Sequence, residues 1–128
     1  MRYDPEVAPI SADWLALDEM QRIRLVESHH QALGVRLPNL TLHATIHVVV
    51  ENQLAEGLGP VVRALARLTN EGLSRHDAVH AIGSMVAAHL YELMKRPDAP
   101  SAGDAQARLE AAVDRLTAES WLRSAGAD

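Results

Sequence analysis

Residues 40–53, LTLHATIHVVVENQ, decide whether this chain is helical or contains a β-sheet. As a strand, the segment alternates hydrophobic and polar residues from Leu40 to Val48, which places its histidines on the polar face. As a helix, it stacks His43, His47 and Glu51 along one side, because residues four apart share a helix face. The two interpretations imply different chemistry for these side chains.

Three observations favour the helix. The uninterrupted segment between Pro38 and Gly57 is longer than most strands. The alternation fails at Val49 and Val50, which are both hydrophobic. No other segment has strand character, and a lone strand leaves its backbone N–H and C=O groups without a ladder partner. We therefore predict a helix over residues 40–56, in which burial outweighs the low helix propensity of β-branched residues.

Start and stop signals outline further helices around this one. Asp18 and Gln21 form a capping-box pattern. Pro60 suits the first position of a helix, and Ser74 suits a helix cap. The expected helices cover residues 18–33, residues 40–56, the stretch from Pro60 to Gly72, the stretch from Ser74 to Pro97, and residues 105–122.

The chain has 128 residues and is expected to form one all-α domain. Because short connections make neighbouring helices antiparallel, we expect an antiparallel four-helix bundle plus an additional C-terminal helix. Residues 1–96 would form the bundle core with an extended N-terminal lead-in, where Ser11 caps a short first turn. PDAPSAGD, residues 97–104, reads as a linker. The helix over 105–122 would pack on the same domain or at a dimer interface.

Composition excludes several classes of function. The formal net charge is -5 and the basic residues form no run, so an electrostatic nucleic-acid interface is not expected. Cysteine is absent, which excludes disulfides, thiolate metal sites and cysteine catalysis. No hydrophobic run reaches transmembrane length, and MRYDPEVAPIS is too acidic and proline-broken for a signal peptide. We expect a soluble, cytoplasmic protein that does not bind membranes.

Histidine is the compositional outlier. There are 7 histidines, and most fall in the close pairs His29/His30, His43/His47 and His76/His80. Residues four apart on a helix lie about 6 Å apart along the axis, so the last two pairs can each converge on one ion. In a strand the separation would be about 13 Å, too far to share a metal. In the predicted bundle, all three pairs would meet in one layer.

Such a layer suits a transition metal, because helical bundles hold these ions with imidazole and carboxylate groups from facing helices. Glu51 continues the row of His43 and His47 and is expected as a ligand or as a partner of His47. Adjacent residues on a helix point about 100° apart, so only one of His29 and His30 can face inward. Iron is the first expectation, as one or two ions, with zinc and manganese as alternatives.

A family resemblance adds to this pattern. LHATIHVVVENQLAEG followed by SRHDAVHAIGSMVAAHLYE resembles DUF1841, a bacterial family of unknown function, over about residues 25–95. The shared pattern is a histidine near the end of the first long helix, then H-x-x-x-H-x-x-x-E-x-Q, then R-H-x-x-x-H-A. This sequence departs from it at Ala88, where an acidic residue is expected. The positions carried over are His30, His43, His47, Glu51, Gln53, Arg75, His76 and His80.

The resemblance selects His30 over His29 as the inward-facing residue. The spacing of HVVVE and HDAVH is also loosely similar to that of hemerythrin-type di-iron bundles. The predicted metal ligands are then His30, His43, His47, Glu51, His76 and His80.

Other groups near these residues have competing interpretations. Asp77 suits the first turn of its helix better as a cap partner than as a ligand. Arg75 is expected at the surface, with pairing to Glu51 as the alternative. Gly83, close to His80, is expected to permit a close approach between helices.

These patterns predict a metal-binding helical bundle with a mononuclear or dinuclear site. With two irons, the expected role is binding or reducing O2, peroxide or NO, as in a metal-dependent oxidoreductase. With one zinc, an open coordination position would activate water, as in a hydrolase. Two alternatives stay open: a non-enzymatic interaction or oligomerisation module, which can be a homodimer, and a haem protein with two axial histidines.

Overall fold

The computed structural model describes residues 1–34, 39–95 and 102–126, and the regular secondary structure in these ranges is α-helical. The prediction of an all-α fold is therefore confirmed, and the ambiguous segment is a helix rather than a strand. The helices are α1 (Ser11–Ala16), α2 (Glu19–Ala32), α3 (Leu40–Ala55), α4 (Gly59–Asn70), α5 (Arg75–Lys95), α6 (Ala102–Arg115) and α7 (Ala118–Gly126).

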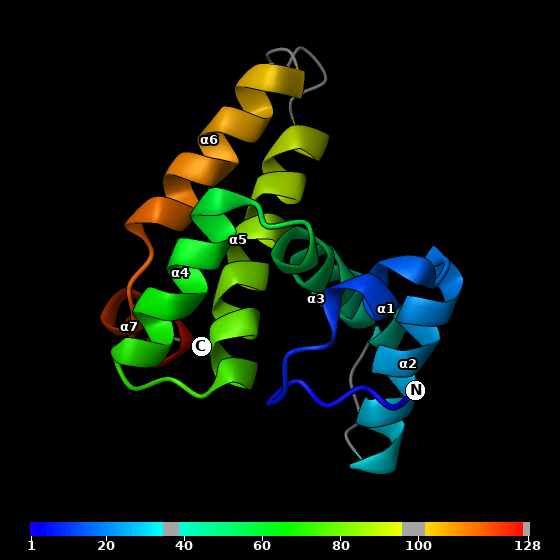
Figure 1. The fold of residues 1–128 in the computed structure, drawn as a ribbon. Coiled ribbons are helices and arrows are strands. Elements are labelled where there is room, and N and C mark those ends of the chain that lie inside the picture. Colours follow the sequence, from blue (N-terminus) through cyan, green and yellow to red (C-terminus); the bar gives the residue numbers. More distant parts are fainter. Residues whose placement is uncertain (35–38, 96–101, 127–128) are drawn as a thin grey trace.

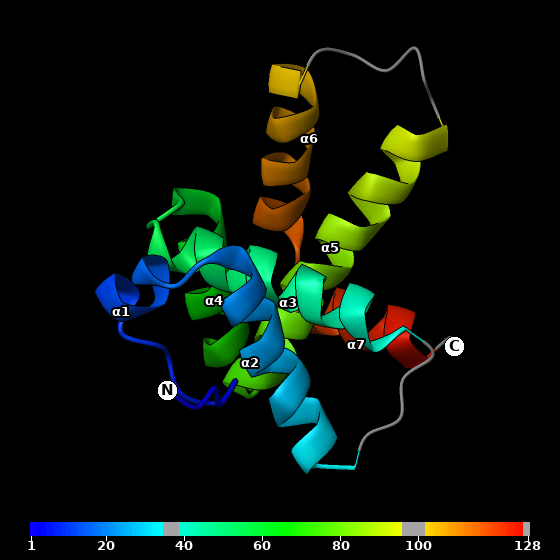
Figure 2. The ribbon, with the colours of Figure 1, turned by 90° about the vertical axis from the view of Figure 1, so that its right-hand side faces the viewer.

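Helix α3 lies at the centre of the molecule. In Figure 1 it is seen nearly end-on, with α2 on one side and with α4, α5 and α6 running up the other side. Figure 2 shows the same helix from its side, close to α2. Accordingly, α3 contacts α2 as well as α4 and α5, while α6 packs on α4 and α5. The antiparallel four-helix arrangement itself stays a prediction.

Helix α3 is central because its hydrophobic side chains point in two directions and pack into two different cores. Ala44 and Val48 pack in a core with Trp14 and other residues from the N-terminal part of the chain. Val50 belongs to a second core, formed with residues of α4 to α7, and Val49 packs against it. The valine run that breaks the strand alternation is therefore explained by burial on two sides of one helix.

The predicted helix starts are largely confirmed. Asp18 and Gln21 form a complete capping box before α2, with each side chain bonded to the other residue's backbone N–H. Pro60 lies in the first turn of α4. The Ser74 hydroxyl accepts a hydrogen bond from the Asp77 N–H, so Ser74 caps α5. The short helix α1 differs, because its cap residue is Ile10 rather than Ser11 and makes no side-chain cap bond.

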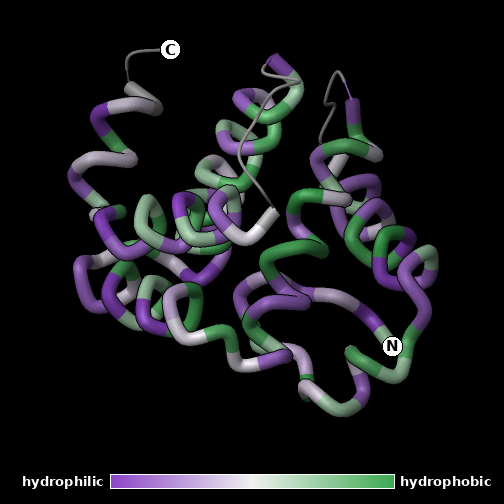
Figure 3. Tube along the Cα trace, turned by 90° about the horizontal axis from the view of Figure 1, so that it is seen from above, coloured by the Kyte–Doolittle hydropathy of each residue, from purple (hydrophilic) through white to green (hydrophobic). Residues whose placement is uncertain are grey.

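Hydrophobic and hydrophilic residues follow one another at short intervals along the chain. Figure 3, coloured by hydropathy, shows no helix that is hydrophobic throughout. Within the described ranges, no helix is both long enough and hydrophobic enough to cross a membrane.

The C-terminal part differs from the prediction of a linker over 97–104 and one helix over 105–122. Residues 97–101 lie outside the described ranges, and 102–104 already belong to α6. The expected single helix is two helices, because the helical conformation is interrupted at Leu116 and Thr117. Thr117 and Ser120 form a reciprocal cap for α7, each side chain accepting the other's backbone N–H. This local pattern, a hydroxyl residue followed three positions later by another, starts a new helix at α7 and so interrupts the predicted single helix.

Contacts from α4 stabilise the break between α6 and α7. The Arg67 guanidinium donates to the carbonyl oxygens of Val113 and Leu116, at 2.8 and 2.9 Å, and so satisfies the end of α6. The Glu71 carboxylate accepts from the backbone N–H of Ala118 at 2.8 Å, at the start of α7. The end of α6 and the start of α7 therefore both contact α4 or its C-terminal end in the same chain.

Candidate metal centre

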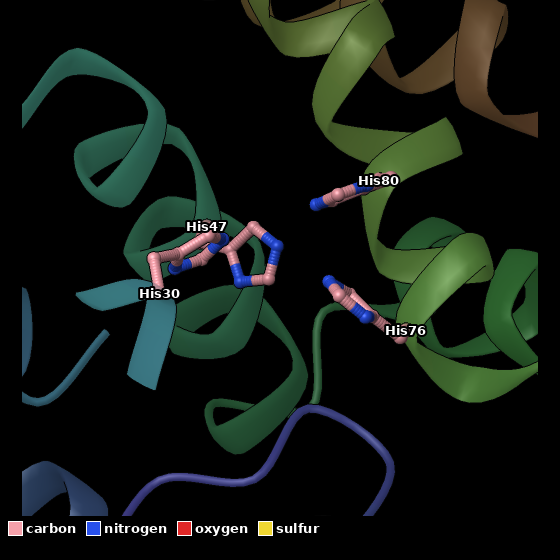
Figure 4. A group of neighbouring side chains, drawn as sticks. All are labelled: His30, His47, His76 and His80. Atoms are coloured by element: carbon pink, nitrogen blue, oxygen red, sulfur yellow. The ribbon is translucent and has the colours of Figure 1, made fainter. Parts of the chain in front are cut away.

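Four histidines from three helices bring their ring nitrogens together. His30 comes from α2, His47 from α3, and His76 and His80 from α5. Each offers one ring nitrogen such that the four atoms lie within 4.8 Å of one another. Figure 4 shows these side chains pointing toward one another across the space between the helices. The i, i+4 spacing places His76 and His80 on one face of α5, with ring centroids 4.4 Å apart.

The remaining predicted ligand histidine, His43, and the unselected His29 flank this four-histidine group. The His43 ring lies 4.7 Å from that of His30 and 4.9 Å from that of His80, between ring centroids. The His29 ring lies farther out, 6.2 Å from that of His76. His30 is 3% exposed and His29 is half-buried, so the inward-facing member of this pair is His30.

The Nε2 atoms of all six clustered histidines are buried and have no hydrogen-bond partner. Buried polar atoms are normally paired, so these six nitrogens share an unused capacity to bind a ligand in one place. The opposite nitrogen of His30 is satisfied, because its Nδ1 lies 2.8 Å from the Val26 carbonyl oxygen. A carbonyl can only accept, so Nδ1 carries the proton and Nε2 keeps its lone pair for a metal.

His47 is oriented in the same way by Tyr3. The Tyr3 hydroxyl lies 3.2 Å from His47 Nδ1 and donates to Glu51 Oε2 at 2.5 Å. Because its proton is given to Glu51, the hydroxyl oxygen accepts from His47 Nδ1–H. His47 Nε2 is therefore left as an acceptor. A metal-binding imidazole usually donates its other ring N–H to a carboxylate, a backbone carbonyl or water. Here the Tyr3 hydroxyl, itself bound to the Glu51 carboxylate, takes that position.

Glu51 is buried and both of its oxygens are occupied. Arg75 donates to Oε1 at 2.8 Å and to Oε2 at 2.9 Å, and Oε2 also accepts from Tyr3. The sequence predicts Glu51 either as a metal ligand or as a partner of His47. These contacts correspond to the second role, with the Tyr3 hydroxyl lying between Glu51 and His47. The expectation that Arg75 lies at the surface is wrong, because only 13% of its side chain is exposed. The alternative expectation, that Arg75 pairs with Glu51, is the one observed, and it places Arg75 in the interior because Glu51 is buried.

The N-terminal segment closes one side of the cluster. Besides Tyr3, the Pro5 carbonyl accepts a hydrogen bond from Arg75 at 2.9 Å. The Glu6 carboxylate accepts from the His76 backbone N–H at 2.6 Å, at the start of α5. From sequence alone, these residues are expected only as an extended lead-in. The one local signal was Tyr3 itself, an aromatic residue in a chain with few of them.

Burial favours the neutral form of five histidines in the cluster, because it lowers their pKa values. Desolvation, followed by repulsion from the neighbouring histidines, lowers the pKa of His47 to about 2 and that of His80 to about 4. The pKa values of His29, His43 and His76 are also lowered, with desolvation as the largest cause. Neutral imidazoles are the form that binds metal ions.

These shifts predict that acid destabilises the metal-free protein. A histidine in the unfolded chain takes up a proton below pH about 6.5, whereas His80 in the folded chain stays neutral until pH about 4. The unfolded state then binds more protons, so the free energy of unfolding falls as the pH falls from about 6.5 toward about 4. Urea unfolding of metal-free protein between pH 7.5 and 4.5 measures this, and His80→Ala should show the weaker pH dependence. Equal slopes for both proteins would contradict the prediction.

Three other predicted residues lie outside the four-histidine group. Asp77 occupies the first turn of α5, with its backbone N–H on Ser74, as expected of a cap partner. The Gln53 side-chain oxygen is buried without a hydrogen-bond partner. Gly83 permits close packing of α5 on α3, since a Cβ there would lie 3.0 Å from Ile46 Cγ2.

Comparisons with protein-family models, with curated proteins and with solved structures find no match to this chain. The resemblances to the DUF1841 family and to hemerythrin-type bundles therefore stay predictions.

Proposed function

We propose that this protein binds a transition-metal ion through His30, His47, His76 and His80. The observation that carries the proposal is the convergence of one ring nitrogen from each of these side chains, whose Nε2 atoms are buried and unpartnered. In a tetrahedral zinc site with Zn–N bonds near 2.0 Å, the nitrogens lie about 3.3 Å apart. The present spacing, up to 4.8 Å, requires only small side-chain rotations to reach that geometry.

The donor set bears on the choice of metal. Four neutral imidazoles suit iron, copper, nickel and zinc, whereas manganese prefers oxygen ligands. The nearby carboxylate of Glu51 is neutralised by Arg75, so it does not supply the bridge that two irons commonly share. These features favour one ion held by the four-histidine group, with iron retained as the first candidate and zinc as the second.

With iron bound, the proposed role is binding or reducing O2, peroxide or NO, which would make the protein a metal-dependent oxidoreductase. The iron would supply the redox chemistry. The chain would hold the ion in a water-poor space, keep His30 and His47 in the required tautomer, and leave His43 beside the ion as a further nitrogen donor. With zinc held by only three of these histidines, the fourth coordination position would bind and activate water.

Metal analysis of untagged protein tests the proposal. Inductively coupled plasma mass spectrometry should find about one equivalent of a transition metal in the wild type and a near-complete loss in His47→Ala and His80→Ala. His89→Ala is the matched control, because His89 lies on the same helix as His80 but outside the four-histidine group. Circular dichroism checks that each variant is folded. Wild-type protein that stays metal-free after reconstitution with iron and zinc would overturn the proposal.

Tyr3→Phe is expected to weaken metal binding by about 10–100-fold, because His47 loses the acceptor that fixes its orientation. Competition with a chromophoric chelator measures the affinity. Tyr91→Phe is the control, since Tyr91 is 57% exposed and lies outside the four-histidine group. An unchanged affinity in Tyr3→Phe would show that Tyr3 has no role in positioning His47.

An interaction or oligomerisation module is the second candidate function. It is supported by exposed hydrophobic side chains near the end of α5, where Leu90 is 43%, Tyr91 57% and Met94 82% exposed. Such side chains can pack against a second copy of the chain. Analytical ultracentrifugation of wild type and Met94→Lys tests this, and a concentration-independent monomer would exclude the homodimer.

A further inference from the structure

A cavity of about 440 Å³ adjoins the four-histidine group, between α3, α5 and α7. Its wall includes His47 and His80 from that group, together with the flanking His43. Much of the remaining wall is hydrophobic and includes Ile46, Val79 and Trp121. The volume is within the range of sites that bind small organic molecules.

The lining determines the chemistry of what can bind. Among the described residues that line the cavity there is no Lys, Arg, Asp or Glu. A charged molecule would lose its hydration there without gaining an ionic partner, which is unfavourable. Two polar side chains in the wall already make hydrogen bonds: Asn39 Oδ1 accepts from the Leu42 N–H, and the Ser84 hydroxyl donates to the Ala81 carbonyl. The buried polar atoms of the wall that have no partner are Nε2 of His43, His47 and His80. The cavity wall is therefore mainly hydrophobic, and its buried unpartnered polar atoms form one cluster of imidazole nitrogens.

The break between α6 and α7 contributes to this cavity. Trp121 belongs to α7 and lines the same space as residues of α3 and α5. A continuous helix through Thr117 would have carried residue 121 onward along the axis of α6. The reciprocal cap at Thr117 and Ser120 instead starts α7 in a new direction.

From this geometry we infer that the cavity is a binding site for a neutral, hydrophobic organic molecule that carries one uncharged nitrogen or oxygen donor. The donor would be directed at the metal held in part by His47 and His80, and the hydrophobic body would fill the space lined by Ile46, Val79 and Trp121. The inference rests on the proposed function, because the metal is the partner of the donor atom.

The probe pair 4-phenylimidazole and imidazole tests the inference. Both present the same donor nitrogen, and only the first has a hydrophobic body to fill the cavity. Isothermal titration calorimetry at pH 8, on protein loaded with the metal found by mass spectrometry, gives both affinities. Burial of the phenyl ring should make 4-phenylimidazole bind about tenfold or more tightly than imidazole.

Two substitutions at neighbouring residues test whether the preference for 4-phenylimidazole over imidazole arises in the cavity. Ala87 lines it and is exposed, so Ala87→Trp should fill its edge and remove the preference without touching the histidines. Ala88 is also exposed but does not line the cavity, and Ala88→Trp should keep the preference. The metal content of each variant is measured in parallel.

The outcomes separate the two proposals. Normal metal content with equal affinities for both probes would overturn the cavity inference and leave the metal site standing. The same conclusion follows if Ala88→Trp loses the preference as fully as Ala87→Trp. Protein that binds no metal would overturn both proposals.

Discussion

Glu51→Gln is expected to lower the free energy of unfolding by about 3–5 kcal/mol, because it leaves the Arg75 guanidinium buried without a counter-charge. Only 1% of the Glu51 side chain and 13% of the Arg75 side chain are exposed, so water cannot replace the lost carboxylate. The same substitution leaves one acceptor oxygen for which the Tyr3 hydroxyl and the Arg75 guanidinium compete, and it places an NH2 donor where the other oxygen stood. Since the total stability of a small domain is about 5–15 kcal/mol, this loss would be a large part of it.

Urea unfolding followed by circular dichroism measures the effect. Asp114→Asn is the matched control, because the Arg63–Asp114 pair has side chains 60% and 42% exposed. Exposed pairs contribute about 0–1 kcal/mol, so this variant should be close to the wild type. The double variant Glu51→Leu/Arg75→Leu should recover part of the loss, since it removes both buried charges. Glu51→Gln with the stability of Asp114→Asn would contradict the burial of the pair.

Trp14→Ala is expected to lower the free energy of unfolding by about 3–5 kcal/mol, through loss of buried area and the cavity that remains. Trp14 is completely buried, and its indole N–H donates to Asn52 Oδ1 at 2.9 Å. It also packs on Tyr3, with ring centroids 5.7 Å apart. The substitution should therefore loosen the residue that orients His47 and weaken metal binding as well.

Trp121→Ala serves as the comparison for Trp14→Ala, because Trp121 is only half-buried. We expect the smaller loss of stability from Trp121→Ala, measured by urea unfolding, and unchanged metal content. If the two variants are equally destabilised, the core around Trp14 is less tightly packed than the structure indicates.

Local signals made most of the helices predictable. The Asp18/Gln21 box, Pro60 and Ser74 act through contacts within one turn, so their effects are visible in sequence. The predicted helix over 40–56 and the observed α3, Leu40–Ala55, differ by one residue at the end. The break at Thr117 differs from the predicted single helix over 105–122, although its cap is also local, because hydrophobic residues recur at helical spacing up to the break, at Leu109, Val113 and Leu116.

The sequence by itself determined that the chain is helical and that two histidine pairs lie on helix faces at metal-binding spacing, because both follow from the i, i+4 periodicity of one helix. Only the tertiary structure decided which nitrogen atoms meet and what holds them. Tyr3 reaches His47 across a sequence separation of 44 residues, and Arg75 reaches Glu51 across 24. No local pattern encodes such contacts, since they depend on how α2, α3, α5 and the N-terminal segment pack together.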